Sequence, residues 1–270
     1  MHCRTVAVAR LAGFYGLACL LTWSCWLPIL AEKRGVLNLH GHTELLATLG
    51  QFGPFAAAVV FIWAENGCRG LLNLTRRMLQ INVRPACLAV ALLLPPVLFA
   101  TAICVNVWLG NQPTPAFHLP EPVGTTLHFL INLAIGGSLG EEPGWRGYAL
   151  PRLRKQFSVL VGSTVLALAW ACWHLPLWWI ANVPSSFPIY VLGMIPLTIL
   201  FTWLDEWGKG SVLVSLLFHA SLNTSLVRLP VFPAILIVNG MFWLVAIPIV
   251  ISKGNKWLSA ATDPSAHPPA

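Results

Sequence analysis

Charged side chains are scarce in this sequence. Asp, Glu, Lys and Arg make up 9% of its 270 residues, whereas a soluble domain carries roughly 25%. The mean hydropathy is +0.73, and several apolar runs reach about 20 residues, the length that spans a bilayer as a helix. These properties exclude an ordinary soluble domain. The sequence therefore predicts an all-α polytopic transmembrane bundle, in which helices satisfy their own backbone hydrogen bonds.

An ordered cysteine pattern is also missing. The seven cysteines form no C-x-x-C pair, and most of them lie within apolar runs. An odd, scattered set favours neither a disulfide framework nor a zinc ribbon. We expect these side chains to act as packing residues.

The chain does contain eight apolar segments joined by polar loops. Between the second and third segments, residues 67–84 interleave leucines with arginines, a pattern typical of a basic helix at the membrane interface. The sequence predicts one bundle over residues 1–251, with its polar motifs in 125–227, and a disordered cytoplasmic tail over 252–270. The predicted spans are residues 6–30, 44–64, 86–109, 125–153, 158–180, 189–204, 211–227 and 231–251.

Eight spans place both termini on the same side of the membrane. Most of the 16 Lys and Arg would lie on that side, and the positive-inside rule then makes it the cytoplasm. We interpret the formal net charge of +7 as a topology signal rather than a nucleic-acid surface. The expected location is the cell membrane of a bacterium, with the lipid bilayer as a partner and no nucleic acid.

The few acidic residues carry the strongest functional signal. The chain has nine Asp and Glu, yet Glu141 and Glu142 are adjacent within an apolar span, where ionisable groups are costly and usually mark a site. Glu142 precedes Arg146 by four residues, the favoured order for an ion pair on a helix, and we expect this pair to be structural. Glu141 points about 100° away on the same helix and has no local cation. Its carboxylate is therefore available for a catalytic role.

Further polar residues lie in two other apolar spans. His219 and Asn223 are four residues apart and share a helix face. Trp170 and His174 have the same spacing, so the indole can pack against the imidazole and fix its rotamer. Counted from the neighbouring loops, Glu141, His174 and His219 lie roughly 15–24 Å along their helices, inside a hydrocarbon core of about 30 Å. The sequence predicts that these groups meet within the bundle.

Such a group suits the hydrolysis of an amide bond. A water held by Glu141 and the two histidines would be the nucleophile, with Glu141 as general base. Asn223 or a histidine could stabilise the oxyanion. Glu141, His174 and His219 would also suit Zn²⁺, although no H-E-x-x-H motif is present. We expect no cofactor, and zinc stays open as an alternative.

The three polar motifs together resemble a known family. Glu-Glu-x-x-x-Arg at 141–146, Trp-x-x-x-His at 170–174 and His-x-x-x-Asn at 219–223 are similar to the motifs of CPBP intramembrane proteases. That family includes CAAX prenyl endopeptidases of the Rce1 type and bacterial bacteriocin-processing or self-immunity proteins. The resemblance predicts an intramembrane protease.

The resemblance also implies roles for individual residues. It makes Glu141, His174 and His219 catalytic, with Asn223 supporting the oxyanion, and it implies a glutamate-activated water rather than a metal. Trp170 stands where the family often has Phe, and we expect little consequence. The substrate would be a membrane-associated protein or peptide, a class that includes lipidated CAAX-type proteins.

Two other classes of function stay open. A proton- or ion-coupled transporter could use Glu141 and the histidines as a relay, although the sequence lacks the internal repeat found in many transporters. A non-catalytic immunity or scaffold protein could instead bind a partner within the membrane. The intact set of Glu141, His174, His219 and Asn223 favours the protease.

Some polar positions have simpler explanations. Residues 136–140 fit G-x-S-x-G, but that motif needs a strand-turn-helix context. Gly136, Gly140 and Gly144 repeat every four residues, which favours close helix packing instead. We expect His128 to be unremarkable, and residues 205–206 to be a solvated acidic pair at a helix end.

Overall fold

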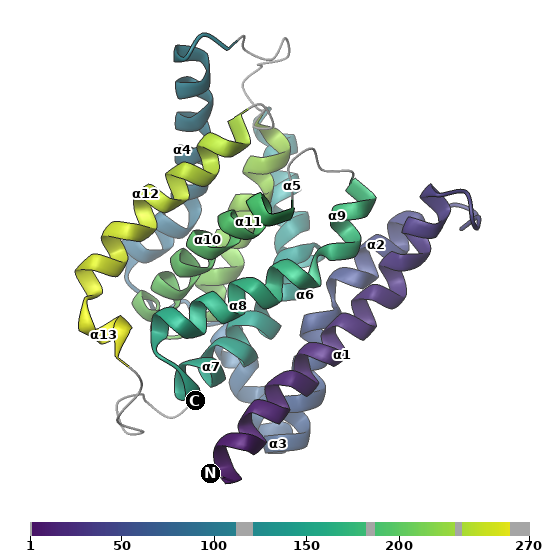
Figure 1. Ribbon diagram of the computed structural model, residues 1–270, viewed down its shortest axis with the longest axis vertical. Helices are drawn as coiled ribbons and strands as arrows, with labels where there is room; N and C mark the ends of the chain where they lie inside the picture. Colours follow the sequence, from purple (N-terminus) through teal and green to yellow (C-terminus); the bar gives the residue numbers. More distant parts are fainter. Residues whose placement is uncertain (1, 112–120, 182–186, 230–233, 260–270) are drawn as a thin grey trace.

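The computed structural model describes residues 2–111, 121–181, 187–229 and 234–259 (Figure 1). Within these ranges the chain is helical and contains no strand. The elements in order are α1 (His2–Lys33), α2 (Thr43–Gln51), α3 (Gly53–Met78), α4 (Pro85–Trp108), α5 (Pro122–Ala134), α6 (Gly137–Glu142), the π-helix η1 (Pro143–Ala149), α7 (Leu150–Gln156), α8 (Val159–Trp173), α9 (Leu175–Ala181), α10 (Phe187–Trp207), α11 (Val212–Arg228), α12 (Ile235–Lys253) and α13 (Asn255–Leu258).

The predicted multi-pass helical bundle is confirmed. In the described ranges, six helical stretches are long and apolar enough to cross a membrane, with Pro122–Gln156 as one of them, and α8 and α11 are shorter apolar helices. These eight stretches overlap the eight predicted spans, but the second predicted span, 44–64, falls on α2 and the first half of α3 rather than on one helix. The prediction that both termini are cytoplasmic stays a prediction.

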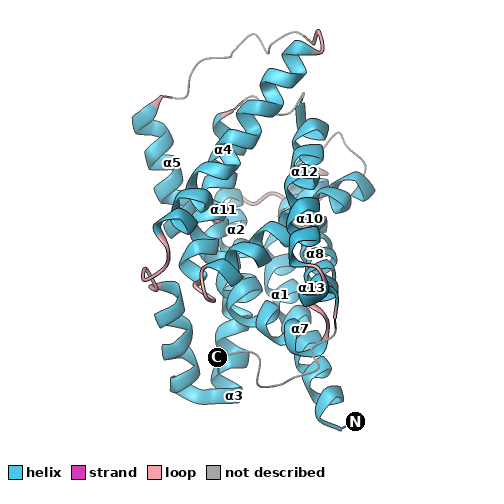
Figure 2. Ribbon diagram, turned by 90° about the vertical axis from the view of Figure 1, so that its left-hand side faces the viewer, coloured by secondary structure: helices cyan, strands magenta, loops and turns pink. Residues whose placement is uncertain are grey.

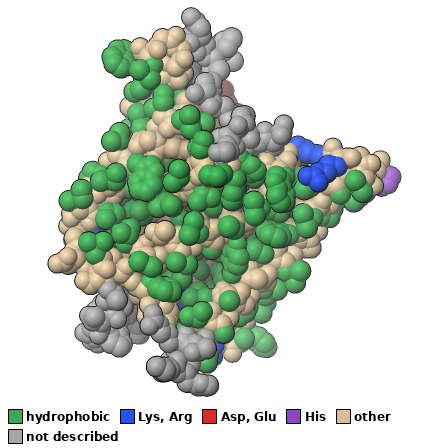
Figure 3. Space-filling view, viewed as in Figure 1, with side chains coloured by type: hydrophobic (Ala, Val, Ile, Leu, Met, Phe, Trp, Pro, Cys, Tyr) green, Lys and Arg blue, Asp and Glu red, His purple; other side chains and the backbone are tan. Residues whose placement is uncertain are grey.

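The outer surface of the bundle suits lipid. Leu20 of α1, Leu93 of α4 and Leu244 of α12 are 66%, 60% and 72% exposed. Figure 3 shows one face covered largely by hydrophobic side chains, with few charged groups on it. A surface of this kind would be an aggregation hazard in water but is the expected outer face of a membrane bundle.

The most enclosed long span is α10. In the most apolar 18 residues of α10, 56% of the residues are buried, whereas in the corresponding stretch of α12 only 17% are buried. Phe201 and Leu204 of α10 are fully buried in the main core. Figure 1 shows α10 and α11 inside the bundle, with α1 and α12 on opposite sides of them. Polar side chains on α11 are therefore kept away from lipid.

The predicted helix over 125–153 is wrong in detail, because that stretch is broken into α5, α6, η1 and α7. The break after α5 falls at Gly136, whose backbone is extended (φ −87°, ψ −165°). A second cause is Pro151, which has no N–H for the carbonyl of Gly147 four residues earlier. Arg77 of α3 donates to that carbonyl at 2.9 Å and to the carbonyl of Arg146 at 3.2 Å. The π-helix η1 is thus stabilised by the side chain of Arg77, which comes from another helix.

The basic stretch predicted at 67–84 forms the second half of α3. The helix bends at Gly67, which has a positive φ of 57° that favours glycine, and Figure 2 shows the bent α3. Beyond the bend, Leu72 and Leu79 are exposed. Its place at the membrane interface stays a prediction.

The end of α10 corrects two expectations. Asp205 is 3% exposed rather than solvated, and Arg154 donates to it at 3.1 Å. Glu206 accepts a hydrogen bond from the indole of Trp257 at 2.9 Å, and that indole is fully buried in α13. The expected disordered tail therefore began too early, because Trp257 anchors the chain after α12. Residues 260–270 lie outside the described ranges.

Candidate active site

Glycines let the acidic segment approach the start of α3. A Cβ on Gly140 would lie 2.5 Å from the carbonyl oxygen of Gln51, and one on Gly144 would lie 2.5 Å from that of Pro54. The predicted close helix packing is therefore correct at these two positions. At Gly136 the three atoms nearest to a Cβ all belong to Asn132, so the contact shown there is with the neighbouring turn of the chain.

Glu142 forms the predicted ion pair and a second bond that the sequence did not reveal. Its Oε1 accepts from Arg146 Nη1 at 2.9 Å and lies 2.7 Å from His219 Nδ1. Both members of the ion pair are fully buried. The Arg146 guanidinium also lies 4.4 Å from the ring centre of Trp170 and 3.7 Å from that of Phe201. Glu142 thus connects the buried cation to the orientation of His219.

Glu141 is held by the indole of Trp170. Trp170 Nε1 donates to Glu141 Oε2 at 2.6 Å, while the ring centres of Trp170 and His174 lie 5.7 Å apart. The predicted ring contact is present, but the hydrogen bond to Glu141 was missed. A Phe at this position could not make it, so the expectation that Trp170 has little consequence does not fit the geometry.

His174 lies at the C-terminal end of α8. Its Nδ1 is 2.9 Å from the carbonyl oxygen of Trp170. A carbonyl only accepts hydrogen bonds, so Nδ1 carries the proton in this contact and Nε2 keeps a lone pair. The helix stops here because Pro176, two residues later, cannot continue its hydrogen bonding. Trp170 therefore fixes both the carboxylate of Glu141 and the tautomer of His174.

Asn223 approaches the acidic segment from α11. Its Nδ2 donates to Asn132 Oδ1 at 3.4 Å. A Cβ on Gly137 would lie 2.9 Å from Glu141 Oε1, 3.4 Å from Asn223 Nδ2 and 3.5 Å from Gln51 Oε1. The polar side chains of Glu141, Asn223 and Gln51, from three different helices, thus lie close to Gly137, where the lack of a side chain leaves room for them.

These groups face a cavity of about 590 Å³, within the range usual for ligand sites. All four residues predicted to be catalytic line it. Several polar lining residues were not predicted, and His128 was expected to be unremarkable, although its Nε2 is buried with no hydrogen-bond partner among the described residues. The polar lining residues are Gln51, His128, Asn132, Glu141, His174, His219, Asn223 and Asn239, and the rest of the lining is largely apolar or aromatic.

The sequence held only a weak signal for the missed residues. Gln51 directly precedes the short stretch that includes Gly53-Pro54, where α2 ends and α3 begins. Asn239 is a lone amide in the apolar span α12. Polar side chains within apolar spans are candidates for a site, and this reasoning could have selected both.

The alternative zinc site does not fit this arrangement. No three His, Cys, Asp or Glu side chains in the described ranges are grouped so that they could hold a metal ion. His174 and His219 each use Nδ1 for a contact within the protein, and Glu141 Oε2 is bonded to Trp170. These contacts leave Nε2 of each histidine and Oε1 of Glu141 for other contacts.

Comparisons with known proteins agree with this geometry. Residues 122–225 match the model of the family described as type II CAAX prenyl endopeptidase Rce1-like, a range that includes all four candidate catalytic residues. The chain is also 24% identical over 223 residues to a CAAX prenyl protease 2 of Methanococcus maripaludis. The aligned region covers 77% of this chain and 81% of that protein. The fold, the cavity and these matches define a multi-pass intramembrane protease. These matches support a protease of the CPBP family.

Proposed function

We propose that this protease hydrolyses a peptide bond with a water that is activated by Glu141 and His174. The observation that carries the proposal is that Trp170 binds both groups at the wall of one cavity. Its indole holds Glu141 Oε2 and its carbonyl holds His174 Nδ1. Glu141 Oε1 and His174 Nε2 are left to accept the two protons of a single water.

The proposed reaction uses only side chains of this chain. Glu141 takes a proton from the water while the water oxygen attacks the substrate carbonyl. The amide N–H of Asn223 and an imidazolium form of His219 stabilise the oxyanion. Glu142, which accepts from His219 Nδ1, balances the charge on that imidazolium. The proton on Glu141 then passes to the leaving amine, which yields a carboxylic acid and an amine.

The proposed substrate is a membrane-associated protein or peptide, cleaved in the cell membrane. The cavity wall includes large apolar side chains from four helices: Phe99, Trp178, Met194 and Phe242. Such a wall suits an apolar chain, and a related protein is named for CAAX prenyl proteolysis. A peptide with a lipidated C-terminal CAAX sequence is therefore the first substrate to test.

The experiment compares purified wild type with Glu141→Gln and His174→Gln in detergent on a fluorogenic lipidated peptide. General acid–base catalysis contributes roughly 10²–10⁴-fold, so each variant should lower kcat by about 10²-fold or more. Glu44→Gln is the matched control, because Glu44 is an exposed glutamate in the first turn of α2. Thermal unfolding should show that all variants remain folded. Cleavage by Glu141→Gln at the wild-type rate would refute the proposal.

A further inference from the structure

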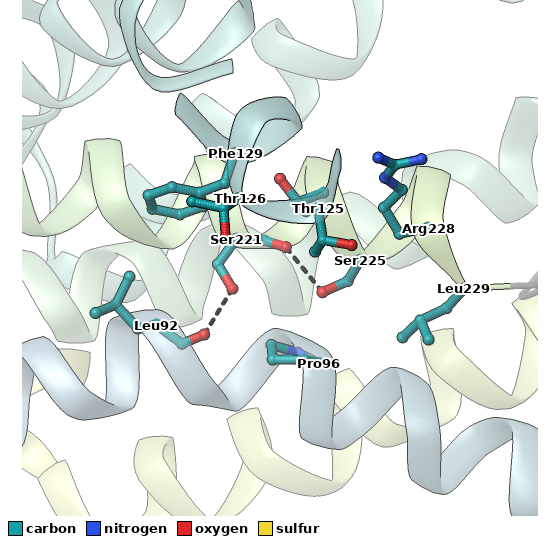
Figure 4. Close-up of a pocket in the computed structure, with 10 residues that line it drawn as sticks. Leu92, Pro96, Thr125, Thr126, Phe129, Ser221, Ser225, Arg228 and Leu229 are labelled. Atoms are coloured by element: carbon teal, nitrogen blue, oxygen red, sulfur yellow. Dashed lines mark hydrogen bonds between the residues drawn. The ribbon is translucent and has the colours of Figure 1, made fainter. Parts of the chain in front are cut away.

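A second cavity of about 340 Å³ lies between α4, α5 and α11 (Figure 4). It shares no lining residue with the active-site cavity. Its volume falls within the range of ligand pockets in proteins. Its lining combines apolar side chains with hydroxyl groups and one cation, and the proposed reaction does not use it.

The sequence explains how this cavity forms. Pro96 has no N–H, so the carbonyl of Leu92 four residues earlier loses its helical partner. Ser221 of α11 donates to that carbonyl at 2.6 Å, and Ser225 donates to the carbonyl of Ser221 at 2.8 Å. Figure 4 shows both bonds. Ser221 thus joins α11 to α4, and the hydroxyl protons of both serines are committed to the protein.

Two other polar groups at the cavity have no partner in the described part of the chain. Thr224 is 7% exposed, and its Oγ1 is buried without a hydrogen bond, as is Nε of Arg228. Buried polar groups are normally paired, because leaving them unpaired costs free energy. A guanidinium only donates hydrogen bonds. The missing partner of Arg228 is therefore an acceptor.

The nearest acid does not supply that acceptor. Glu121 directs Oε1 to the N–H of Val123 and Oε2 to the N–H of Gly124, at 2.8 and 2.5 Å, and so caps α5. A Cβ on Gly124 would meet both this carboxylate and the Arg228 guanidinium, so the two groups are neighbours. No ion pair joins them within the described ranges. Arg228 keeps its hydrogen-bonding capacity for another group.

The cavity changes from polar to apolar along its helices. Arg228 is the last residue of α11, and Glu121 caps the first turn of α5, so in a bundle whose helices cross a membrane this end is expected near the lipid headgroups. Phe129 is seven residues into α5, about 10 Å deeper, and Pro96 lies near the middle of α4. A soluble anion would use only the charged end, whereas a phospholipid matches both ends.

We propose that this cavity binds one phospholipid molecule. Its phosphate accepts hydrogen bonds from Arg228 and Thr224, and one acyl chain lies against Pro96 and Phe129. The site is separate from the catalytic groups, so its test does not depend on the identity of the substrate.

The test is binding of phosphatidylglycerol to the delipidated full chain in detergent, followed by native mass spectrometry. The wild type should bind one molecule at a saturable site. Arg228→Leu should weaken binding by about tenfold or more, since a charge-assisted hydrogen bond is lost. Arg34→Leu, which removes an exposed arginine outside the cavity, should bind like the wild type.

Thr224→Val keeps the proposal testable if Arg228→Leu fails to fold. Because Oγ1 of Thr224 has no hydrogen-bond partner among the described residues, its loss should leave the melting temperature unchanged but weaken lipid binding. Wild-type binding by both variants would overturn the proposal. Equal binding of a diacylglycerol with the same acyl chains would also overturn it, as would full competition by inorganic phosphate, since the site would then not recognise a phospholipid.

Discussion

Replacing Glu142 by Gln tests how the buried charges hold the site together. Glu142 Oε1 contacts Arg146 Nη1 at 2.9 Å and His219 Nδ1 at 2.7 Å, and the ion pair is fully buried. Gln keeps the shape of the side chain but removes its charge. Removing one partner of a buried ion pair costs about 3–5 kcal/mol, because the other charge is left uncompensated. We expect a clear loss of thermal stability together with low activity.

The double variant Glu142→Gln/Arg146→Met separates the two effects. It removes both charges, and replacing a buried ion pair by uncharged side chains is often neutral or stabilising. The melting temperature should therefore return towards that of the wild type. Activity should stay low, because His219 has lost the carboxylate that balances its imidazolium form.

Thermal unfolding and peptide cleavage would be measured for the wild type, both single variants and the double variant, as a double-mutant cycle. Glu44→Gln again serves as the exposed control. The reasoning would be refuted if Glu142→Gln were within about 1 kcal/mol of the wild type in stability, a cost typical of an average single substitution. Wild-type activity in the double variant would show that Glu142 does not act through His219.

Two further substitutions have expected outcomes. Trp170→Phe removes the 2.6 Å bond to Glu141 and should lower kcat by about tenfold to a hundredfold, since such a bond contributes roughly 1.5–3 kcal/mol; an unchanged kcat in the peptide assay would contradict this role. Gly140→Ala should lower the melting temperature by the equivalent of about 1–3 kcal/mol, because its Cβ would lie 2.5 Å from the carbonyl oxygen of Gln51. Gly16→Ala is the matched control, since a Cβ there meets nothing within 4 Å, and equal melting temperatures for the two variants would contradict the packing argument.

Most of the spans could be predicted, because a long apolar run is enough to indicate a helix that crosses a membrane. The break within 125–153 could not, since neighbouring helices can satisfy the backbone groups that Gly and Pro leave free in a membrane helix. Here Arg77 supplies those bonds to Gly147 across 70 residues of sequence. A local pattern contains no information about such a distant donor.

The candidate site, too, could be predicted only in part. Spacing along a helix sets the depth of a residue, and the four residues predicted to meet do line one cavity. Spacing does not set how one helix is rotated towards another. No specific partner was therefore predicted for His219, whereas the structure pairs it with Glu142. The approach of Gln51 from α2 was missed for the same reason.

The most direct test of the account is peptide cleavage by the wild type and by Glu141→Gln, each with a strong chelator and then with added Zn²⁺. The account predicts that the chelator leaves the wild-type kcat unchanged and that Glu141→Gln stays inactive under every condition. Loss of wild-type activity on chelation, restored by Zn²⁺, would contradict the central claim that a glutamate-activated water cleaves the peptide.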